Sequence, residues 1–229
     1  LMLVFTYSLH KELISKKDGI YSTLILSTTY IWIDYAHLSN QDMIFACLIT
    51  SGIYSLIKLK QKRNSIFLIF FGSWIGLAFM MKTFFVIVPL VTLFPYLLSK
   101  RESINTKFIF IGTLIGFIPF LIWFVSINSY LDKNIILYLF DKFNSLSAKN
   151  TFTNPFYYYL WNIPVNFMPW SIFSIVGIIS QFRNNKKVNY LLVYFPLFFI
   201  IILSLFSTKT PYYVLPISSI LSLNAYLGL

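Results

Sequence analysis

The chain has 229 residues, of which 58% are hydrophobic, 20% aromatic and 11% charged, with a net charge of +11. A soluble domain of this length needs far more polar surface around its core, so an ordinary soluble fold, a disordered chain and a disulfide scaffold are excluded. The apolar runs are long and lack the alternation of outer-membrane barrel strands. They predict an all-α, polytopic transmembrane helix bundle.

About eight apolar runs that approach membrane-crossing length follow one another with short connections, and some are partial. We therefore expect residues 1–229 to form a single transmembrane domain, and a fragment of a larger membrane protein because the chain starts and stops inside apolar runs. Pro164 and Pro169 are expected to break one of these helices. In chain order, the predicted helices cover residues 1–9, 19–35, 43–57, 65–81, 84–98, 108–127, 156–182 and 190–206, with a last one starting at 213.

The positive charge follows the connections between the helices. Thirteen of the 18 basic residues lie in alternate connections, which the positive-inside rule assigns to the cytoplasm. Topology and contact with membrane lipids thus explain most of the charge, and no nucleic-acid partner is expected. The thirteen residues are Lys11, Lys16, Lys17, Lys58, Lys60, Lys62, Arg63, Lys100, Arg101, Lys107, Arg183, Lys186 and Lys187.

Residues 128–154 form the one long connection on the outer side. Within it, Ile135, Leu139, Phe143 and Leu146 fall on one helical face, which predicts a helix lying in the outer membrane interface. Two interpretations stay open. The helix is either a connector that rests on lipid or a roof over a cavity where a lipid head group docks.

Ionisable residues collect on the outer side, and at membrane depth such residues are candidates for a functional site. Asp42 opens a helix, either as an acid favoured by the helix dipole or as a site carboxylate that positions an acceptor or a divalent metal. Lys82 lies between two apolar helices with no loop to solvate it. It either extends to the interface or binds an anion.

Other outer residues suit recognition of a phosphate or a sugar. Lys209, Tyr212 and Tyr213 lie in a tight turn that also contains hydroxyl groups. His37 is either an exposed interface histidine or an acid–base group. Trp161 belongs to an aromatic belt or offers a platform for a sugar or prenyl chain.

Several chemistries are excluded by residue counts and by missing motifs. A single cysteine, Cys47, forms no disulfide within the chain, and two histidines are too few for Cys–His metal sites, although a metal held by carboxylates stays open. The sequence contains no Walker loop, dinucleotide-binding fingerprint or metalloprotease motif. The cytoplasmic connections are too short for a nucleotide-binding domain.

Three stretches resemble the bacterial polyprenyl-phosphate-dependent glycosyltransferases of the GT-C fold, which include family-39 protein mannosyltransferases and the aminoarabinose transferase that modifies lipid A. The most specific is LFSTKTPYYVLP at residues 205–216. The others are YAHLSNQD at 35–42 and GLAFMMK at 76–82, which is followed by Pro89. Thr83 stands where the family usually has glycine after the lysine.

The resemblance implies transfer of a sugar from a polyprenyl-phosphate donor to an acceptor lipid, glycan or protein, on the outer face of the cytoplasmic membrane and with inversion. Lys82 and Lys209 would stabilise the departing phosphate, and Asp42 would position the acceptor, a metal or the base. The family's principal catalytic acid lies in a first outer loop, which this chain lacks and which is expected before Leu1.

Two other functions stay open from the sequence. A transporter or flippase for lipid-linked sugars would show polar residues at mid-depth and repeated halves, and neither is evident. A catalytically inactive membrane subunit is consistent with the missing first loop. The sequence does not identify the sugar or the acceptor.

Overall fold

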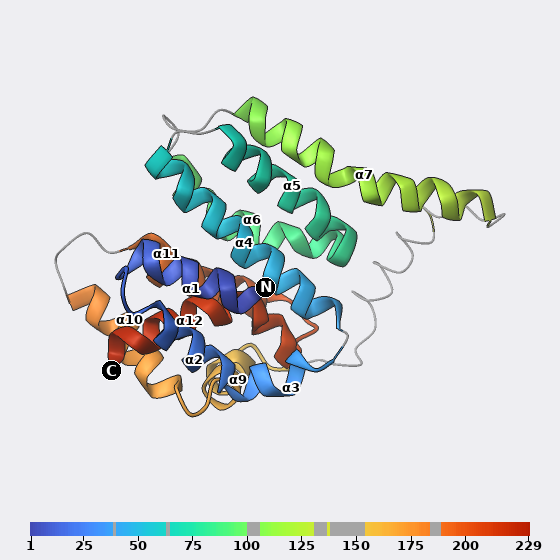
Figure 1. Ribbon diagram of the computed structural model, residues 1–229. Coiled ribbons are helices and arrows are strands. Elements are labelled where there is room, and N and C mark those ends of the chain that lie inside the picture. Colours follow the sequence, from blue (N-terminus) through green and yellow to red (C-terminus); the bar gives the residue numbers. More distant parts are fainter. Residues whose placement is uncertain (39, 63–64, 100–105, 131–136, 138–153, 184–188) are drawn as a thin grey trace.

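The computed structural model describes residues 1–38, 40–62, 65–99, 106–130, 137, 154–183 and 189–229. Within these ranges every regular element is a helix and none is a strand (Figure 1). This confirms the predicted all-α class. The α-helices are α1 (Met2–Leu13), α2 (Gly19–Ser27), α3 (Tyr30–Ala36), α4 (Gln41–Lys62), α5 (Ser65–Lys82), α6 (Ile87–Ser99), α7 (Thr106–Tyr130), α9 (Tyr158–Asn166), α10 (Ser171–Arg183), α11 (Tyr190–Leu205) and α12 (Leu215–Gly228), and two 3₁₀-helices are η1 (Thr83–Val86) and η4 (Pro211–Val214).

Some of these helices are long and apolar enough to cross a membrane. The helical stretch Ile66–Leu98, which turns after Lys82 from α5 through η1 into α6, and the stretch Thr106–Asn128 of α7 meet that criterion of length and composition. The pair α9 and α10 meets it jointly as one broken span with a bend of 114°. The other apolar runs of the described chain also form helices, which are shorter or more polar. The predicted break near the prolines is confirmed, and Pro169 lies at the bend while Pro164 stays inside α9.

The predicted single helix over residues 19–35 is instead two helices, α2 and α3. The break follows from two adjacent threonines. Thr28 donates its hydroxyl to the carbonyl of Leu24 at 2.9 Å, and Thr29 donates to that of Leu26 at 2.7 Å. The Thr29 oxygen also accepts the backbone N–H of Trp32 at 3.3 Å, so this side chain caps the start of α3. The apolar run alone predicts one helix, because hydropathy does not register the hydrogen bonds that the two threonine hydroxyls make to the backbone.

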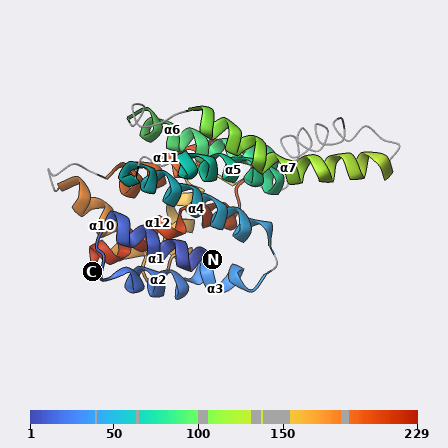
Figure 2. The ribbon, with the colours of Figure 1, turned by 45° about the horizontal axis from the view of Figure 1, so that its top comes forward.

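Helices α5 and α7 pack backbone to backbone along a seam of glycines (Figure 2). The seam consists of Gly72 and Gly76 on α5 and of Gly112 and Gly116 on α7. A Cβ atom built on Gly112 would lie 2.1 Å from the backbone oxygen of Ile69, far inside van der Waals contact. Small residues at this spacing let two membrane helices approach closely.

The helix ends divide into two groups at opposite ends of the bundle (Figure 1). The ends of α4, α6 and α10 lie on one side together with the starts of α5, α7 and α11, and the start of α4, the turn from α5 into η1, and η4 lie on the other. We call the first the basic end, because it carries Lys58, Lys107 and Arg183, and the second the site end. This arrangement agrees with the alternation that the basic residues predict.

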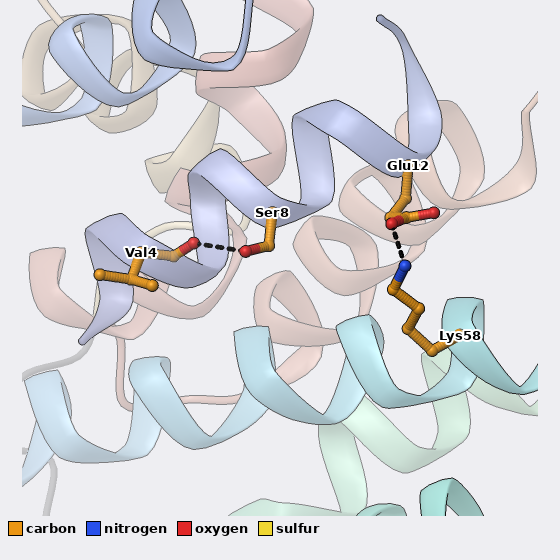
Figure 3. A network of polar contacts seen from close by, with 4 residues as sticks. All are labelled: Val4, Ser8, Glu12 and Lys58. Atoms are coloured by element: carbon orange, nitrogen blue, oxygen red, sulfur yellow. Dashed lines mark hydrogen bonds and ion pairs between the residues drawn. The ribbon is translucent and has the colours of Figure 1, made fainter. Parts of the chain in front are cut away.

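An ion pair joins α1 to α4 at the basic end (Figure 3). Lys58 of α4 pairs with Glu12 of α1, and its ammonium also lies 5.8 Å from the centre of the Tyr54 ring. The hydrogen bond from Lys58 to Glu12 raises the pKa of the lysine. In the same view, Ser8 donates to the carbonyl of Val4 at 2.9 Å, one turn back in α1.

The predicted outer segment, residues 128–154, is described only at 128–130, 137 and 154. The interfacial helix expected there, with Ile135, Leu139, Phe143 and Leu146, therefore lies outside the described residues.

Candidate functional site

An ion pair lies at the site end of the bundle. Asp42 in the first turn of α4 pairs through its Oδ1 atom with the Nζ atom of Lys82, the last residue of α5. The two side chains are only 8% and 10% exposed. The Asp42 backbone N–H is held by Asn40, whose side-chain oxygen accepts it at 3.0 Å. Two residues that the sequence singled out separately are thus brought together.

Aromatic rings surround the Lys82 ammonium. The nitrogen lies 5.0 Å from the ring centre of Tyr213, 5.2 Å from that of Tyr212 and 5.6 Å from that of Phe85. Tyr35 in turn packs edge-on against Tyr212, with ring centres 6.0 Å apart. Cation–π attraction and the Asp42 carboxylate therefore hold the buried positive charge from several sides.

The turn that presents Lys82 depends on an unusual backbone conformation at the next residue. Thr83 has a φ of +42°, in the left-handed region that favours glycine. A β-branched residue is strained there. Thr83 therefore adopts the conformation for which glycine is best suited, at the position where the resembling family usually has glycine. The turn interrupts the helix directly after the ammonium-bearing residue, and η1 then carries Phe85 back toward it.

Lys209 lies at the site end as well, but its ammonium contacts backbone. It donates to the carbonyl of Phe206 at 2.6 Å and to that of Asn154 at 2.9 Å, and the residue is only 5% exposed. The Asn154 side chain donates back to the carbonyl of Lys209 at 3.0 Å. These groups form a turn that leads directly into η4, which carries Tyr212 and Tyr213.

His37 and Trp161 occupy exposed positions. His37 follows α3 and hydrogen-bonds through Nδ1 to the carbonyl of Ile33 at 2.9 Å. Trp161 in α9 is 51% exposed and packs edge-on against Tyr158. The structure describes neither ring among the groups around Lys82. Their substrate contacts stay a prediction.

The predicted metal site was also based on Asp42. Among the described residues, no group of three or more His, Cys, Asp and Glu side chains gathers to hold an ion. The Asp42 carboxylate itself carries an ammonium, which opposes a second cation. A metal role for Asp42 stays a prediction, and no step below depends on a metal.

Sequence reasoning missed some residues of the site. Phe85 faces Lys82 across the turn, and Tyr35 belongs to the stretch 35–42 that carries part of the family resemblance. Tyr159 donates its hydroxyl to the Thr210 carbonyl at 3.3 Å, and Asn154 contacts Lys209. The available signal for Phe85 was its position three residues after the lysine. No local pattern pointed to Asn154.

Comparison with solved structures gives the same architecture. The crystal structure of ArnT from Cupriavidus metallidurans bound to undecaprenyl phosphate superposes with a TM-score of 0.80 over 99% of this chain, at 15% sequence identity. The apo structure of the same protein gives a TM-score of 0.77 at 14% identity. The chain covers 43% and 42% of those two structures. This likeness shows that the chain has the fold of ArnT.

Curated relatives extend over nearly the whole chain. A protein of Aquifex aeolicus without an assigned function is 28% identical over 219 residues, which is 93% of this chain. The undecaprenyl phosphate-alpha-4-amino-4-deoxy-L-arabinose arabinosyl transferase of Wigglesworthia glossinidia brevipalpis is 26% identical over 228 residues. The chain spans 43% and 40% of the length of these two relatives.

A family model also matches residues 1–124, more than half of the chain, and that match includes both Asp42 and Lys82. Together with the helical architecture and the relatives, it places this chain in the dolichyl-phosphate-mannose-protein mannosyltransferase family.

Proposed function

We propose that the protein is a membrane glycosyltransferase that transfers a sugar from a polyprenyl-phosphate donor to an acceptor at the outer face of the cytoplasmic membrane, with inversion at the anomeric carbon. The observation that carries the proposal is the buried Lys82 ammonium, framed by aromatic rings and paired with Asp42 at the end of the bundle opposite the basic connections. Family membership and the ArnT-like fold support it.

Lys82 suits the departing group of this reaction. When an acceptor hydroxyl attacks the anomeric carbon, the bond from that carbon to the phosphate oxygen breaks, and negative charge develops on the phosphate. The donor phosphodiester already carries one negative charge, and a fixed ammonium in a site with little water stabilises the greater charge of the departing phosphate monoester more strongly. Tyr212 and Tyr213 supply hydroxyl groups and apolar faces beside it, which suit a phosphate attached to a prenyl chain.

Asp42 has a different role in the proposal. Its carboxylate neutralises Lys82, so a bound phosphate competes with it for the same ammonium. Repulsion between the two anions turns the carboxylate toward the acceptor, where it positions the attacking hydroxyl. The proton of that hydroxyl passes to a carboxylate base. We do not assign this base to Asp42, because its carboxylate is paired with the Lys82 ammonium.

The test is transfer by the full-length protein in lipid nanodiscs, using polyprenyl-phosphate sugars that include mannose and aminoarabinose donors. We expect Lys82→Met to lower kcat about 100-fold or more, the usual effect of removing a group that stabilises a developing anion. Lys11→Met makes the same change in an exposed residue of α1 and should leave transfer within about twofold. Wild-type transfer by the Lys82→Met protein would contradict the proposal.

A second variant separates the two members of the ion pair. Asp42→Asn should lower transfer while binding of a polyprenyl monophosphate stays the same or becomes tighter, because the lysine loses its competing anion. Loss of phosphate binding in this variant would show that Asp42 holds the donor. Movement of the donor across vesicle membranes with no glycosidic product would favour the transporter instead.

A further inference from the structure

The turn between α11 and η4 is joined to residues 154–159 by a set of hydrogen bonds to backbone carbonyls. Lys209 donates to the Asn154 carbonyl at 2.9 Å, and Asn154 donates back to the Lys209 carbonyl at 3.0 Å. Tyr159 donates to the Thr210 carbonyl at 3.3 Å. We call the reciprocal pair formed by Lys209 and Asn154 the clamp.

The Lys209 ammonium is committed to this clamp. A buried ammonium is costly unless its protons are hydrogen-bonded, and two of its three donors are used on the carbonyls of Phe206 and Asn154. Phe206 follows directly after α11 as its C-cap residue, at a helix end where carbonyls lack partners within the helix. A lysine near a helix C-terminus commonly satisfies such carbonyls and is favoured by the helix dipole.

The clamp acts directly on the proposed site. Lys209 lies two residues before Pro211, where η4 begins. Tyr212 and Tyr213 follow within η4, and their rings lie 5.2 Å and 5.0 Å from the Lys82 ammonium. The rings also pack edge-on against each other, with centres 5.2 Å apart. Fixing the start of η4 therefore fixes both rings with respect to Lys82.

We propose that Lys209 is a positioning residue: its hydrogen bonds to residues 154 and 206 hold the Tyr212–Tyr213 pair over Lys82, and it does not itself bind the donor phosphate. The inference rests on the proposed function for the identity of the ligand. It departs from the sequence-based expectation that both lysines contact the phosphate, and it makes Asn154, at the end of the long outer segment, a part of the same device.

The experiment compares Lys209→Met and Asn154→Ala with the wild type in the full-length protein in nanodiscs. Amide hydrogen exchange of residues 212–214 reports directly on the clamp. We expect exchange there to rise about tenfold in Lys209→Met, with a smaller rise in Asn154→Ala, the sizes expected for losing charged and neutral hydrogen bonds. Lys11→Met is the matched control and should leave exchange at 212–214 unchanged.

Donor binding is the second measurement, with a polyprenyl monophosphate as the binding probe and the polyprenyl-phosphate sugar as the substrate in the transfer assay. Lys209→Met should raise the KM of that substrate about tenfold and change kcat much less. Each substitution removes one hydrogen bond of the clamp and leaves the other, because both acceptors are backbone carbonyls, so the double variant should lose more than either single variant. Lys82→Met, by contrast, should lower kcat and leave exchange at 212–214 largely unchanged.

The possible outcomes separate the two proposals. Weaker donor binding in Lys209→Met with unchanged exchange would mean that Lys209 contacts the donor, and the clamp proposal would be wrong. A double variant whose exchange at 212–214 equals that of the wild type would also overturn it. A wild-type protein that binds no polyprenyl phosphate would refute the proposed function, while the exchange measurement would still decide on the clamp. Asn154→Ala retains the lysine and decides the question if Lys209→Met does not fold.

Discussion

At the scale of single residues, the Lys82 site depends on a strained neighbour. Thr83 holds a φ of +42°, a conformation that costs a β-branched residue about 1–2 kcal/mol. Such strain persists only where the surroundings enforce it, and here Asp42 and the rings around Lys82 hold the preceding residue in place. The strained conformation of Thr83 thus ends α5 directly after Lys82, which helix propensity alone would not do.

The strain predicts the effect of replacing Thr83 by glycine. Thr83→Gly should stabilise the protein by up to about 1 kcal/mol, because relief of the left-handed conformation exceeds the greater entropy that glycine has when unfolded. Thr23→Gly makes the same change inside α2 and should destabilise by about 0.3 kcal/mol, the difference in helix propensity between threonine and glycine. Unfolding in mixed micelles measures both. A Thr83→Gly protein that is less stable than wild type would show that the threonine side chain contributes more than its strain costs.

At the scale of helices, α7 depends on its glycine seam with α5. The outward positions of α7, such as Leu114, Ile118 and Val125, are 50–66% exposed and face the surroundings of the bundle. Only 11% of the most apolar stretch of α7 is buried inside the bundle. Its attachment to α5 therefore relies on backbone contact at Gly112 and Gly116. In lipid, where apolar side chains gain little from leaving the solvent, this close packing supplies much of the helix–helix attraction.

Filling the seam should therefore separate the two helices. Gly112→Ala places a methyl group 2.1 Å from the Ile69 oxygen, and because this neighbour is backbone, a helix must shift. We expect a loss of about 1–3 kcal/mol in stability, the usual range for overpacking. Leu114→Ala on the exposed face of α7 should change stability by less than about 0.5 kcal/mol. Equal stability of Gly112→Ala and wild type in micelle unfolding would refute the seam's importance.

Helix positions were largely predictable from the sequence, and contacts between helices were not. The apolar run over 190–206 becomes α11, Tyr190–Leu205, because hydrophobic length is a local property. The break at Thr28 and Thr29 is not predicted from hydropathy, because two hydroxyl groups that bond to helix carbonyls hardly change the hydropathy of a long apolar run. The seam motif was visible as Gly-x₃-Gly in both helices, but only the structure shows that the two motifs face each other.

The site divides in the same way. Asp42 and Lys82 were both singled out because charge is rare near membrane depth, but their pairing depends on how α4 and α5 pack. The hydrogen bonds of Lys209 to backbone carbonyls could not be predicted, because its partner Asn154 is 55 residues away in the sequence and carries no charge. Residue chemistry identifies candidates, and tertiary packing decides which of them share a site.

At the scale of the whole molecule, the two ends of the bundle differ in charge and in chemistry. Lys58, Lys107 and Arg183 belong to the helix ends at one end of the bundle, and the Asp42–Lys82 pair joins the start of α4 to the end of α5 at the other. From the positive-inside rule we predict that the site end of the bundle faces outward. A donor attached to a prenyl chain and a site at the membrane boundary fit this orientation, since the phosphate stays at interface depth while the chain remains in lipid.

Labelling with a membrane-impermeant maleimide tests this orientation. Cys47 is the only cysteine of residues 1–229, so Cys47→Ser, combined with serine at any cysteine elsewhere in the full-length protein, gives a background in which single cysteines are introduced. His37 at the site end and Lys17 beside the basic end are both exposed. In intact spheroplasts that produce the full-length protein, we expect His37→Cys to react and Lys17→Cys to react only after the membrane is opened.

The reverse pattern would place the site in the cytoplasm, because the same reagent and the same background report on both positions. It would then rule out transfer at the outer face while leaving the Asp42–Lys82 geometry unaffected, so orientation and chemistry are decided independently.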